Sequence, residues 1–141
     1  MEVEAVELNI VYLDDHQLFA FSLFEQCIHP LFSKVNARAF VDGDDAMEHI
    51  LESIKNKIKI DLFITDINHP GLKGDCIAHM IRGYEKQYGS KYRIPILVIS
   101  MVADNEDSPF YDPSGTVVQK YLTKATSVEE ITEAINQLVG N

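Results

Sequence analysis

The sequence DLFITD (residues 61–66) decides the predicted fold, because it joins a short apolar run to a terminal carboxylate. Adjacent leucine, phenylalanine and isoleucine are typical of a strand that is buried on both faces. Asp66 cannot be buried there without a compensating partner, so we expect it where the strand ends. In open α/β sheets, ligands bind at that end of the strands. The run therefore predicts a buried strand that delivers Asp66 to a binding edge.

Three further apolar runs end at polar side chains. They are residues 9–13 (NIVYL) before Asp14 and Asp15, residues 94–99 (IPILVI) before Ser100, and residues 117–123 (VVQKYLT) before Lys124. An aspartate after a strand also serves as a helix N-cap, which is the plain structural alternative for the acidic pair. Three clustered carboxylates, however, repel one another unless a cation lies among them, and hard oxygen ligands suit Mg²⁺. A hydroxyl and an ammonium add what phosphoryl oxygens need, so the set predicts a phosphoryl-transfer site.

The rest of the chain alternates predicted helices and strands, which favours a parallel sheet with helices on both faces. The predicted helices cover residues 16–31, 44–54 and 75–88, and a second strand covers residues 35–40. The last helix begins at a capping box of Ser127 and Glu130. Its apolar stripe should pack on the sheet and leave Glu129 and Glu133 in solvent; the stripe is Val128, Ile131, Ile135 and Leu138.

Composition limits the classes of function. A chain of 141 residues with 46% hydrophobic content has the size of one domain. Its net charge of −10 argues against direct binding to nucleic acid or to an anionic membrane. No apolar stretch approaches the roughly 20 residues that span a bilayer, and the acidic N-terminus lacks a signal peptide's basic region. We expect a cytoplasmic protein in which Cys27 and Cys76 are reduced and buried.

These residues resemble the receiver domain of two-component response regulators over nearly the whole chain. The matching positions follow the family's order; they are Asp14, Asp15, Asp66, Asn68, Pro70, Gly74, Ser100, Tyr121 and Lys124. The resemblance implies one receiver domain over residues 1–141, with no output domain in this chain. It also implies a flavodoxin-like, doubly wound sheet of five parallel strands.

The resemblance further implies a phosphoprotein in which Asp66 accepts a phosphoryl group from a sensor histidine kinase or a phosphotransfer protein. Mg²⁺ would be bound directly by Asp15 and Asp66, through water by Asp14, and by the backbone carbonyl of Asn68. The transfer would convert Asp66 to an aspartyl phosphate. The domain itself would later hydrolyse this phosphate.

The remaining site residues have implied roles in binding the phosphoryl group and in signalling. Lys124 would neutralise one phosphoryl oxygen, and Ser100 would hydrogen-bond another. Tyr121 would move together with Ser100 and so relay a conformational switch to an unknown downstream effector. A homodimer is compatible with this resemblance.

Three departures from the family pattern carry predictions. Met101 follows Ser100 where the family has a small residue, so it should partly cover the acceptor and slow transfer or restrict the donor. Ala125 replaces the proline after Lys124, and the sequence leaves open whether this peptide is cis. Residues 104–114 hold prolines and acids but no apolar stripe, so the fourth helix should be shortened or missing. Phe110 and Tyr111 would then either tuck back onto the sheet or offer an aromatic anchor to a partner.

Two other functions remain open at this stage. A phosphatase of the haloacid dehalogenase type also pairs an aspartate nucleophile with Mg²⁺, but its nucleophile comes first in the chain and a second aspartate follows two positions later. Here the acidic pair precedes Asp66, and Asn68 occupies the later position. The second alternative is a receiver-like docking module that works without phosphorylation. Phosphate-ester turnover would favour the first alternative, and absence of a phosphoryl adduct would favour the second.

Overall fold

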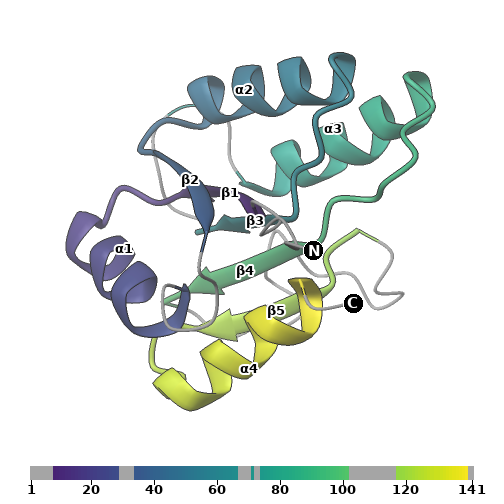
Figure 1. The fold of residues 1–141 in the computed structure, drawn as a ribbon. Helices are drawn as coiled ribbons and strands as arrows, with labels where there is room; N and C mark the ends of the chain where they lie inside the picture. The colour runs from purple at the N-terminus through teal and green to yellow at the C-terminus, as the bar shows by residue number, and fades with distance from the viewer. Residues whose placement is uncertain (1–7, 29–33, 67–70, 72–73, 102–116, 140–141) are drawn as a thin grey trace, which may run out of the picture.

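Five parallel strands form one sheet at the centre of the molecule (Figure 1). The computed structural model describes residues 8–28, 34–66, 71, 74–101 and 117–139. The strands, in the order β2-β1-β3-β4-β5 across the sheet, are β1 (Leu8–Leu13), β2 (Val35–Phe40), β3 (Leu62–Thr65), β4 (Ile96–Ser100) and β5 (Lys120–Thr123). Strand β2 lies on one side of β1, and β3, β4 and β5 follow one another on its other side. This order confirms the predicted doubly wound, flavodoxin-like sheet.

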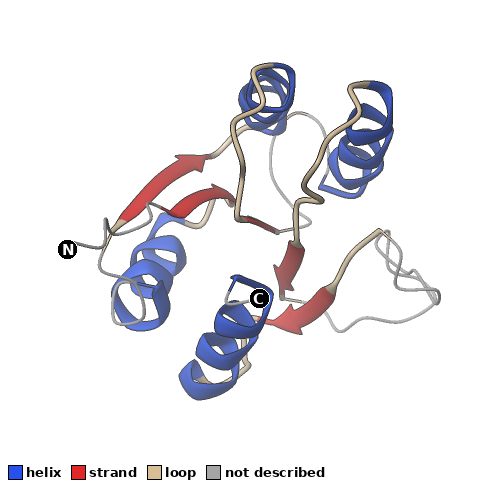
Figure 2. Cartoon of the chain, turned by 45° about the vertical axis from the view of Figure 1, so that its right-hand side comes forward, coloured by secondary structure: helices blue, strands red, loops and turns tan. Residues whose placement is uncertain are grey.

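Helices cover both faces of the sheet (Figure 2). They are α1 (Gln17–Leu23) with a following π-helix η1 (Phe24–Ile28), α2 (Gly43–Lys55), α3 (Gly74–Gln87) and α4 (Val128–Val139). Helices α2 and α3 pack side by side on one face, and α4 packs against η1 on the other. Helices α1, α2 and α3 each lie in a connection between two consecutive strands, as the crossovers of a parallel sheet require.

The apolar core is divided by the sheet into two clusters, because strand side chains alternate between its faces. In β1, Val11 and Leu13 belong to the cluster under α2 and α3. Ile10 and Tyr12 belong to the cluster under α1, η1 and α4. The central strands are buried on both faces, which explains their continuous apolar runs.

Two predicted element boundaries are corrected by the structure. The helix predicted over residues 16–31 is α-helical only to Leu23 and continues as a π-helix over Phe24–Ile28. A π-helix has wider turns, which changes the direction of the following side chains and buries Cys27 and Ile28. The last strand begins at Lys120 rather than at residue 117, although Val117 and Val118 still pack against the core.

Two predicted burials are also corrected. Cys27 is buried as expected, but Cys76 lies on the exposed side of α3; both thiols are free. In α4, Ile131 and Ile135 are buried, whereas Val128 is 40% exposed because it lies in the first turn, beyond the sheet. The expected cap is present: the Ser127 hydroxyl accepts a hydrogen bond of 3.2 Å from the backbone N–H of Glu130.

The connection from β4 to β5 differs from the other connections in its described part. Residues 101 and 117–119, which are the described part of this connection, contain no helix. The predictions for residues 104–114, including Phe110 and Tyr111, lie outside the described residues. Across the described helices, none has both the length and the apolar character needed to cross a bilayer.

Candidate functional site

Three carboxylates meet at the carboxyl edge of the sheet. Asp14 and Asp15 follow β1, Asp66 follows β3, and these two strands are neighbours. The backbone N–H of Asp66 donates to the carbonyl of Leu13 over 2.9 Å, which continues the strand pairing up to the acidic residues. One carboxylate oxygen from each aspartate lies within 4.8 Å of the others. The predicted acidic cluster is therefore assembled.

Lys124 lies between two of these carboxylates. Its Nζ is 2.8 Å from Oδ2 of Asp14 and 3.0 Å from Oδ2 of Asp66, and its side chain is only 6% exposed. Burial alone would lower the pKa of Lys124, but the hydrogen bonds to Asp14 and Asp66 outweigh burial and raise it. Lys124 is therefore a fixed cation that offsets the repulsion between the aspartates.

Asp14 has further partners that hold it in place. Its Oδ1 accepts a hydrogen bond of 2.8 Å from the backbone N–H of His16. Its Oδ2 accepts another of 2.9 Å from the Tyr12 hydroxyl, which is buried. Burial and the neighbouring Asp14 carboxylate raise the pKa of Tyr12, so this hydroxyl remains a donor. Both oxygens of Asp14 are thus occupied within the protein, which leaves the exposed Asp15 better placed for direct contact with a ligand.

Sequence reasoning did not identify Tyr12 and Phe19 as part of this site. Tyr12 is two residues before Asp14 on a strand, so the period of two already put both side chains on one face. The aromatic ring of Phe19 lies under the Lys124 ammonium, with 4.9 Å from Nζ to the ring centroid, and stacks beside the His16 ring at 6.3 Å. Such a cation–π contact stabilises the position of the ammonium.

Ser100 and Tyr121 occupy the two neighbouring strands β4 and β5. Ser100 is fully buried at the end of β4, and its carbonyl accepts a hydrogen bond of 2.7 Å from the backbone N–H of Lys124. Tyr121 is half-buried and packs against the cluster under α2 and α3. Met101 is 72% exposed, so little of its surface covers the site. Its predicted effect on access to Asp66 stays a prediction.

Two remaining predictions about the site have different outcomes. Asn68, whose backbone carbonyl was predicted to bind the metal, lies outside the described residues. The Lys124–Ala125 peptide is trans, since the described part of the chain has no cis peptide bond. The loop has therefore adopted the ordinary isomer, and Lys124 still reaches both aspartates.

The donor set fits a hard divalent cation. Three carboxylates and one ammonium leave two formal negative charges at this edge. Carboxylate oxygens are the ligands that Mg²⁺ prefers, and one or two carboxylates with water commonly complete its shell. One oxygen of each of the three aspartates could contribute to such a shell. Asp14 and Asp66 also contact Lys124, whereas Asp15 is exposed.

Solved structures similar to this one are receiver domains. No family model matches the sequence, and no curated protein matches it. The signal receiver domain of the response regulator NarL from Mycobacterium tuberculosis is 26% identical, with a TM-score of 0.69 over 96% of this chain and 98% of that chain. The receiver domain of the Saccharomyces cerevisiae response regulator Ssk1, solved with the histidine phosphotransfer protein Ypd1, is 18% identical, with a TM-score of 0.72 over 98% and 92%.

A third similar structure is the CheY-like receiver domain protein from Methanospirillum hungatei. It is 17% identical, with a TM-score of 0.67 over 96% of this chain and 95% of that chain. The resemblance expected from the sequence is thereby confirmed: this chain has the fold of response regulator receiver domains, and the three matches cover 96–98% of it. This fold supports a role in two-component signalling.

Proposed function

We propose that this chain is a phosphoacceptor domain in which Asp66 is the acceptor. The observation that carries this proposal is the buried contact of Lys124 with Asp14 and Asp66, beside the exposed Asp15. When a carboxylate attacks a phosphoryl group, a nearby cation must neutralise the negative charge of the incoming oxygens. The Lys124 ammonium, which contacts Asp14 and Asp66, is placed to do so. A purely structural sheet edge has no need of three carboxylates around one buried ammonium.

The transfer would proceed by attack of an Asp66 carboxylate oxygen on the phosphorus of a partner's phosphohistidine. A phosphorus–oxygen bond forms, and the phosphorus–nitrogen bond breaks. The imidazole keeps the electron pair of that bond and takes a proton from solvent. As the phosphoryl oxygens arrive, the Lys124 ammonium would exchange its contact with Asp66 for one with a phosphoryl oxygen, while Asp14 retains it from the other side.

Asp15 and Asp66, with Asp14 behind them and the carbonyl of Asn68 as proposed, would hold Mg²⁺. The bound ion would supply charge neutralisation between the carboxylate and the phosphoryl oxygens. Tyr12 and the backbone of His16 keep Asp14 from turning away, so the geometry exists before any ligand arrives. Such preorganisation lowers the cost of binding the transition state.

We also propose that Ser100 and Tyr121 relay the signal. Ser100 is tied through its carbonyl to the backbone of Lys124, so a displacement at one residue is transmitted to the other. A hydrogen bond from the Ser100 hydroxyl to a phosphoryl oxygen would draw this strand end inward. Tyr121, two residue pairs back along β4 and β5, would then pack more deeply.

The proposed partners are a sensor histidine kinase or a phosphotransfer protein, and an effector that this chain does not identify. The likeness to the receiver of Ssk1, which was solved with the phosphotransfer protein Ypd1, supports this choice. We propose a single receiver domain over residues 1–141 that acts in the cytoplasm, where its free Cys27 and Cys76 would stay reduced. Homodimerisation is part of the same proposal.

The test is intact mass spectrometry after incubation with acetyl phosphate and Mg²⁺. The native chain should gain one phosphoryl group, and Asp66→Asn should gain none. Asp45→Asn is the matched control, because Asp45 is also an aspartate but lies exposed in the first turn of α2. Borohydride reduction of the adduct should convert residue 66 alone to homoserine. An adduct that persists in Asp66→Asn would contradict the assignment of the acceptor.

The same samples separate signalling from phosphatase activity. We propose that the chain does not turn over p-nitrophenyl phosphate, because a phosphatase of the haloacid dehalogenase type needs a general acid two residues after its nucleophile. Steady release of p-nitrophenol that is lost in Asp66→Asn would establish an enzyme. No adduct and no turnover would leave a docking module that acts without phosphorylation.

A further inference from the structure

A pocket lies at the amino edge of the sheet, opposite the aspartates. Helices α2 and α3 end side by side there, and the loops that follow them lead into β3 and β4. The pocket has a volume of about 250 Å³. Apolar side chains line it, among them Ile54, Ile60 and Ile94, and Tyr88 and Tyr92 stand at its margin with about half of their surfaces exposed.

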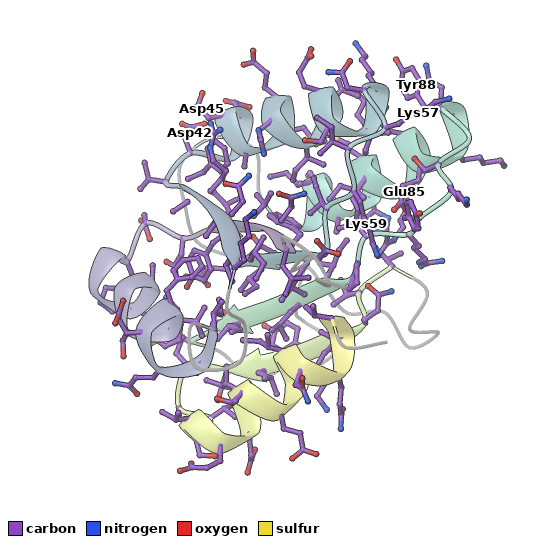
Figure 3. All side chains as sticks on the ribbon, viewed as in Figure 1. Asp42, Asp45, Lys57, Lys59, Glu85 and Tyr88 are labelled. Carbon is purple, nitrogen blue, oxygen red and sulfur yellow. The ribbon has the colours of Figure 1, made fainter. Side chains whose placement is uncertain are left out.

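Lysines surround this pocket. Lys57, Lys59 and Lys91 line it, and none of its lining residues is acidic. The ammonium of Lys59 lies 4.8 Å from the centroid of the Tyr92 ring, and that of Lys91 lies 6.0 Å from it. Figure 3 places Lys57 and Tyr88 at one end of α2 and α3, Lys59 further along the loop that follows α2, and Asp42 at the other end of α2. The two ends of α2 therefore differ in charge.

Half of the cationic side chains of this acidic protein gather here. Of the 12 lysines and arginines in the chain, six are in residues 55–59 and 86–93, and all six are exposed; they are Lys55, Lys57, Lys59, Lys86, Lys91 and Arg93. Lys86, Lys91 and Arg93 also line a shallow groove of about 830 Å³, which shares Ser90, Lys91 and Tyr92 with the pocket. We call the pocket and this groove the basic edge.

Two acids that flank these segments, Asp61 and Glu85, are already engaged. Asp61 accepts a hydrogen bond from the backbone N–H of Asn9 and contacts Lys59 at 3.5 Å. Glu85 accepts hydrogen bonds from Arg82 at 2.8 Å and from the backbone N–H of Ile94 at 2.6 Å. Both carboxylates have side chains that are only about a tenth exposed. These carboxylates bind backbone N–H groups and one cation each, so most of the surface cations remain without an acidic partner among the described residues.

The backbone at Lys57 is also unusual. Helices α2 and α3 end in the same turn, in which the two residues after the helix cap donate back to the last turn. The residue in the left-handed conformation is Gly89 after α3 but Lys57, at φ 58°, after α2. Glycine is the residue that adopts this conformation without strain. The lysine therefore occupies a strained position on the rim of the pocket, where glycine would serve the fold better.

From these observations we infer that the basic edge is a docking surface for an acidic segment of a protein partner. One apolar or aromatic side chain of that segment would enter the pocket beside Tyr88 and Tyr92, and its carboxylates would contact Lys57, Lys59 and Lys91. An apolar centre with a charged rim is the anatomy of a protein interface, and buried aromatic anchors contribute most of the affinity. The pocket volume suits one or two side chains.

Charge complementarity favours a short acidic segment over a long polyanion. The whole chain carries −10, so nucleic acid or an anionic bilayer would meet repulsion wherever it extended beyond this edge. A peptide segment interacts mainly within a Debye length, which is about 8 Å at physiological salt. It can therefore use the local cations and remain largely screened from the remaining acids.

The probe is a synthetic peptide with aspartates and glutamates on both sides of one phenylalanine. Two matched peptides replace the phenylalanine by alanine or the acids by glutamine. Amide resonances of the full-length protein report the binding site and the dissociation constant. We expect shifts at residues 57–60 and 88–94, binding that weakens with salt, and at least about five-fold weaker binding of either matched peptide.

A charge-matched pair of variants tests the lysines. The double variant Lys57→Gln, Lys91→Gln should bind the peptide about ten-fold more weakly. The control Lys34→Gln, Lys120→Gln changes the net charge equally at exposed lysines that do not line the pocket, and should bind as the native chain does. The peptide comparison needs no variant, so it decides the question even if a variant fails to fold.

Three results would overturn the inference: no binding of the acidic peptide, equal loss of affinity in the two double variants, or tighter binding of a single-stranded DNA oligonucleotide or of phosphatidylserine vesicles than of the peptide. The inference is independent of the proposed phosphoryl acceptor. Asp66→Asn should bind the peptide with unchanged affinity, so failure at one edge leaves the other untouched.

Discussion

The two edges of the sheet carry opposite charge, and the charges differ in burial and in pairing. At the carboxyl edge, Lys124 is buried between Asp14 and Asp66 and forms an ion pair with each of them. At the basic edge, most of the cations are exposed, and the nearby acids are used by the backbone. Buried, paired charges have a defined geometry, whereas exposed ones have little energy until a partner removes their water. The first arrangement suits chemistry and the second suits recognition.

The difference predicts that equivalent substitutions have unequal effects at the two edges. Lys124→Ala would leave two buried carboxylates facing each other, and should lower the free energy of unfolding by about 3 kcal/mol in the absence of divalent cations. Urea denaturation with a chelator measures this loss. Lys91→Ala at the basic edge is the comparison, with an expected change within about 0.5 kcal/mol. Equal losses at the two positions would break the contrast between the edges.

Tyr12 tests whether the geometry of Asp14 depends on its buried hydrogen bond. Tyr12→Phe should cost about 1.5 kcal/mol of stability, because it leaves part of a charged acceptor unsatisfied. Tyr88→Phe is the control, since that ring is exposed. Phosphorylation by acetyl phosphate should also slow in Tyr12→Phe, which a role in packing alone would not cause.

The same variant predicts a pH dependence. Folding raises the pKa of Tyr12 above its ordinary value of 10.0, so the folded protein holds this proton more tightly than the unfolded chain. The resulting stability is complete below about pH 10 and is lost as the pH rises toward the folded-state pKa. Folding also raises the pKa of Lys124, which adds to the loss of stability at high pH. Above pH 10, the native chain should therefore lose stability more steeply than Tyr12→Phe, and parallel curves would contradict the assigned shift.

Divalent cations should act on the acidic edge alone. Mg²⁺ at ten times its dissociation constant should stabilise the native chain by about 1.4 kcal/mol. Asp15→Asn should remove most of this gain, while Asp45→Asn should retain it. Thermal unfolding at several Mg²⁺ concentrations measures both. Stabilisation that survives in Asp15→Asn would move the ion away from the predicted ligands.

The smallest expected effect concerns the two helix ends at the basic edge. Lys57→Gly should raise the free energy of unfolding by about 0.5 kcal/mol, because it relieves the left-handed strain. Gly89→Ala should lower it by about 1 kcal/mol, because it introduces the same strain at the matching turn. If Lys57→Gly is more stable yet binds the acidic peptide less well, the lysine is retained for recognition. A destabilised Lys57→Gly would show that this side chain supports the fold.

Much of the acidic site was predictable because it follows one simple rule. Asp14, Asp66, Ser100 and Lys124 each stand directly after an apolar run, and parallel strands end at a common edge. Tyr12 was missed because its apolar neighbours made it look like an ordinary core residue. The period of two along β1 would have identified its proximity to Asp14.

The π-helix and the exposure of Cys76 were not predictable in the same way. Hydrophobic periodicity indicates which face of a helix is buried, but a cysteine fits either face. Cys27 is buried, whereas Cys76 lies on the exposed side of α3, next to the buried Ile77. Which side of a helix is covered depends on side chains of the other elements that pack against it.

The sequence by itself determined the strands, most of the helices and the polar residue at each strand end, because burial and hydrogen bonding of a segment depend on its own pattern. Only the tertiary structure decided which distant residues meet. The order β2-β1-β3-β4-β5 puts Asp14 beside Asp66 and Lys124 across both. It also joins the ends of α2 and α3 into one basic pocket. Contacts between segments depend on crossover connections and packing, and no local pattern encodes these.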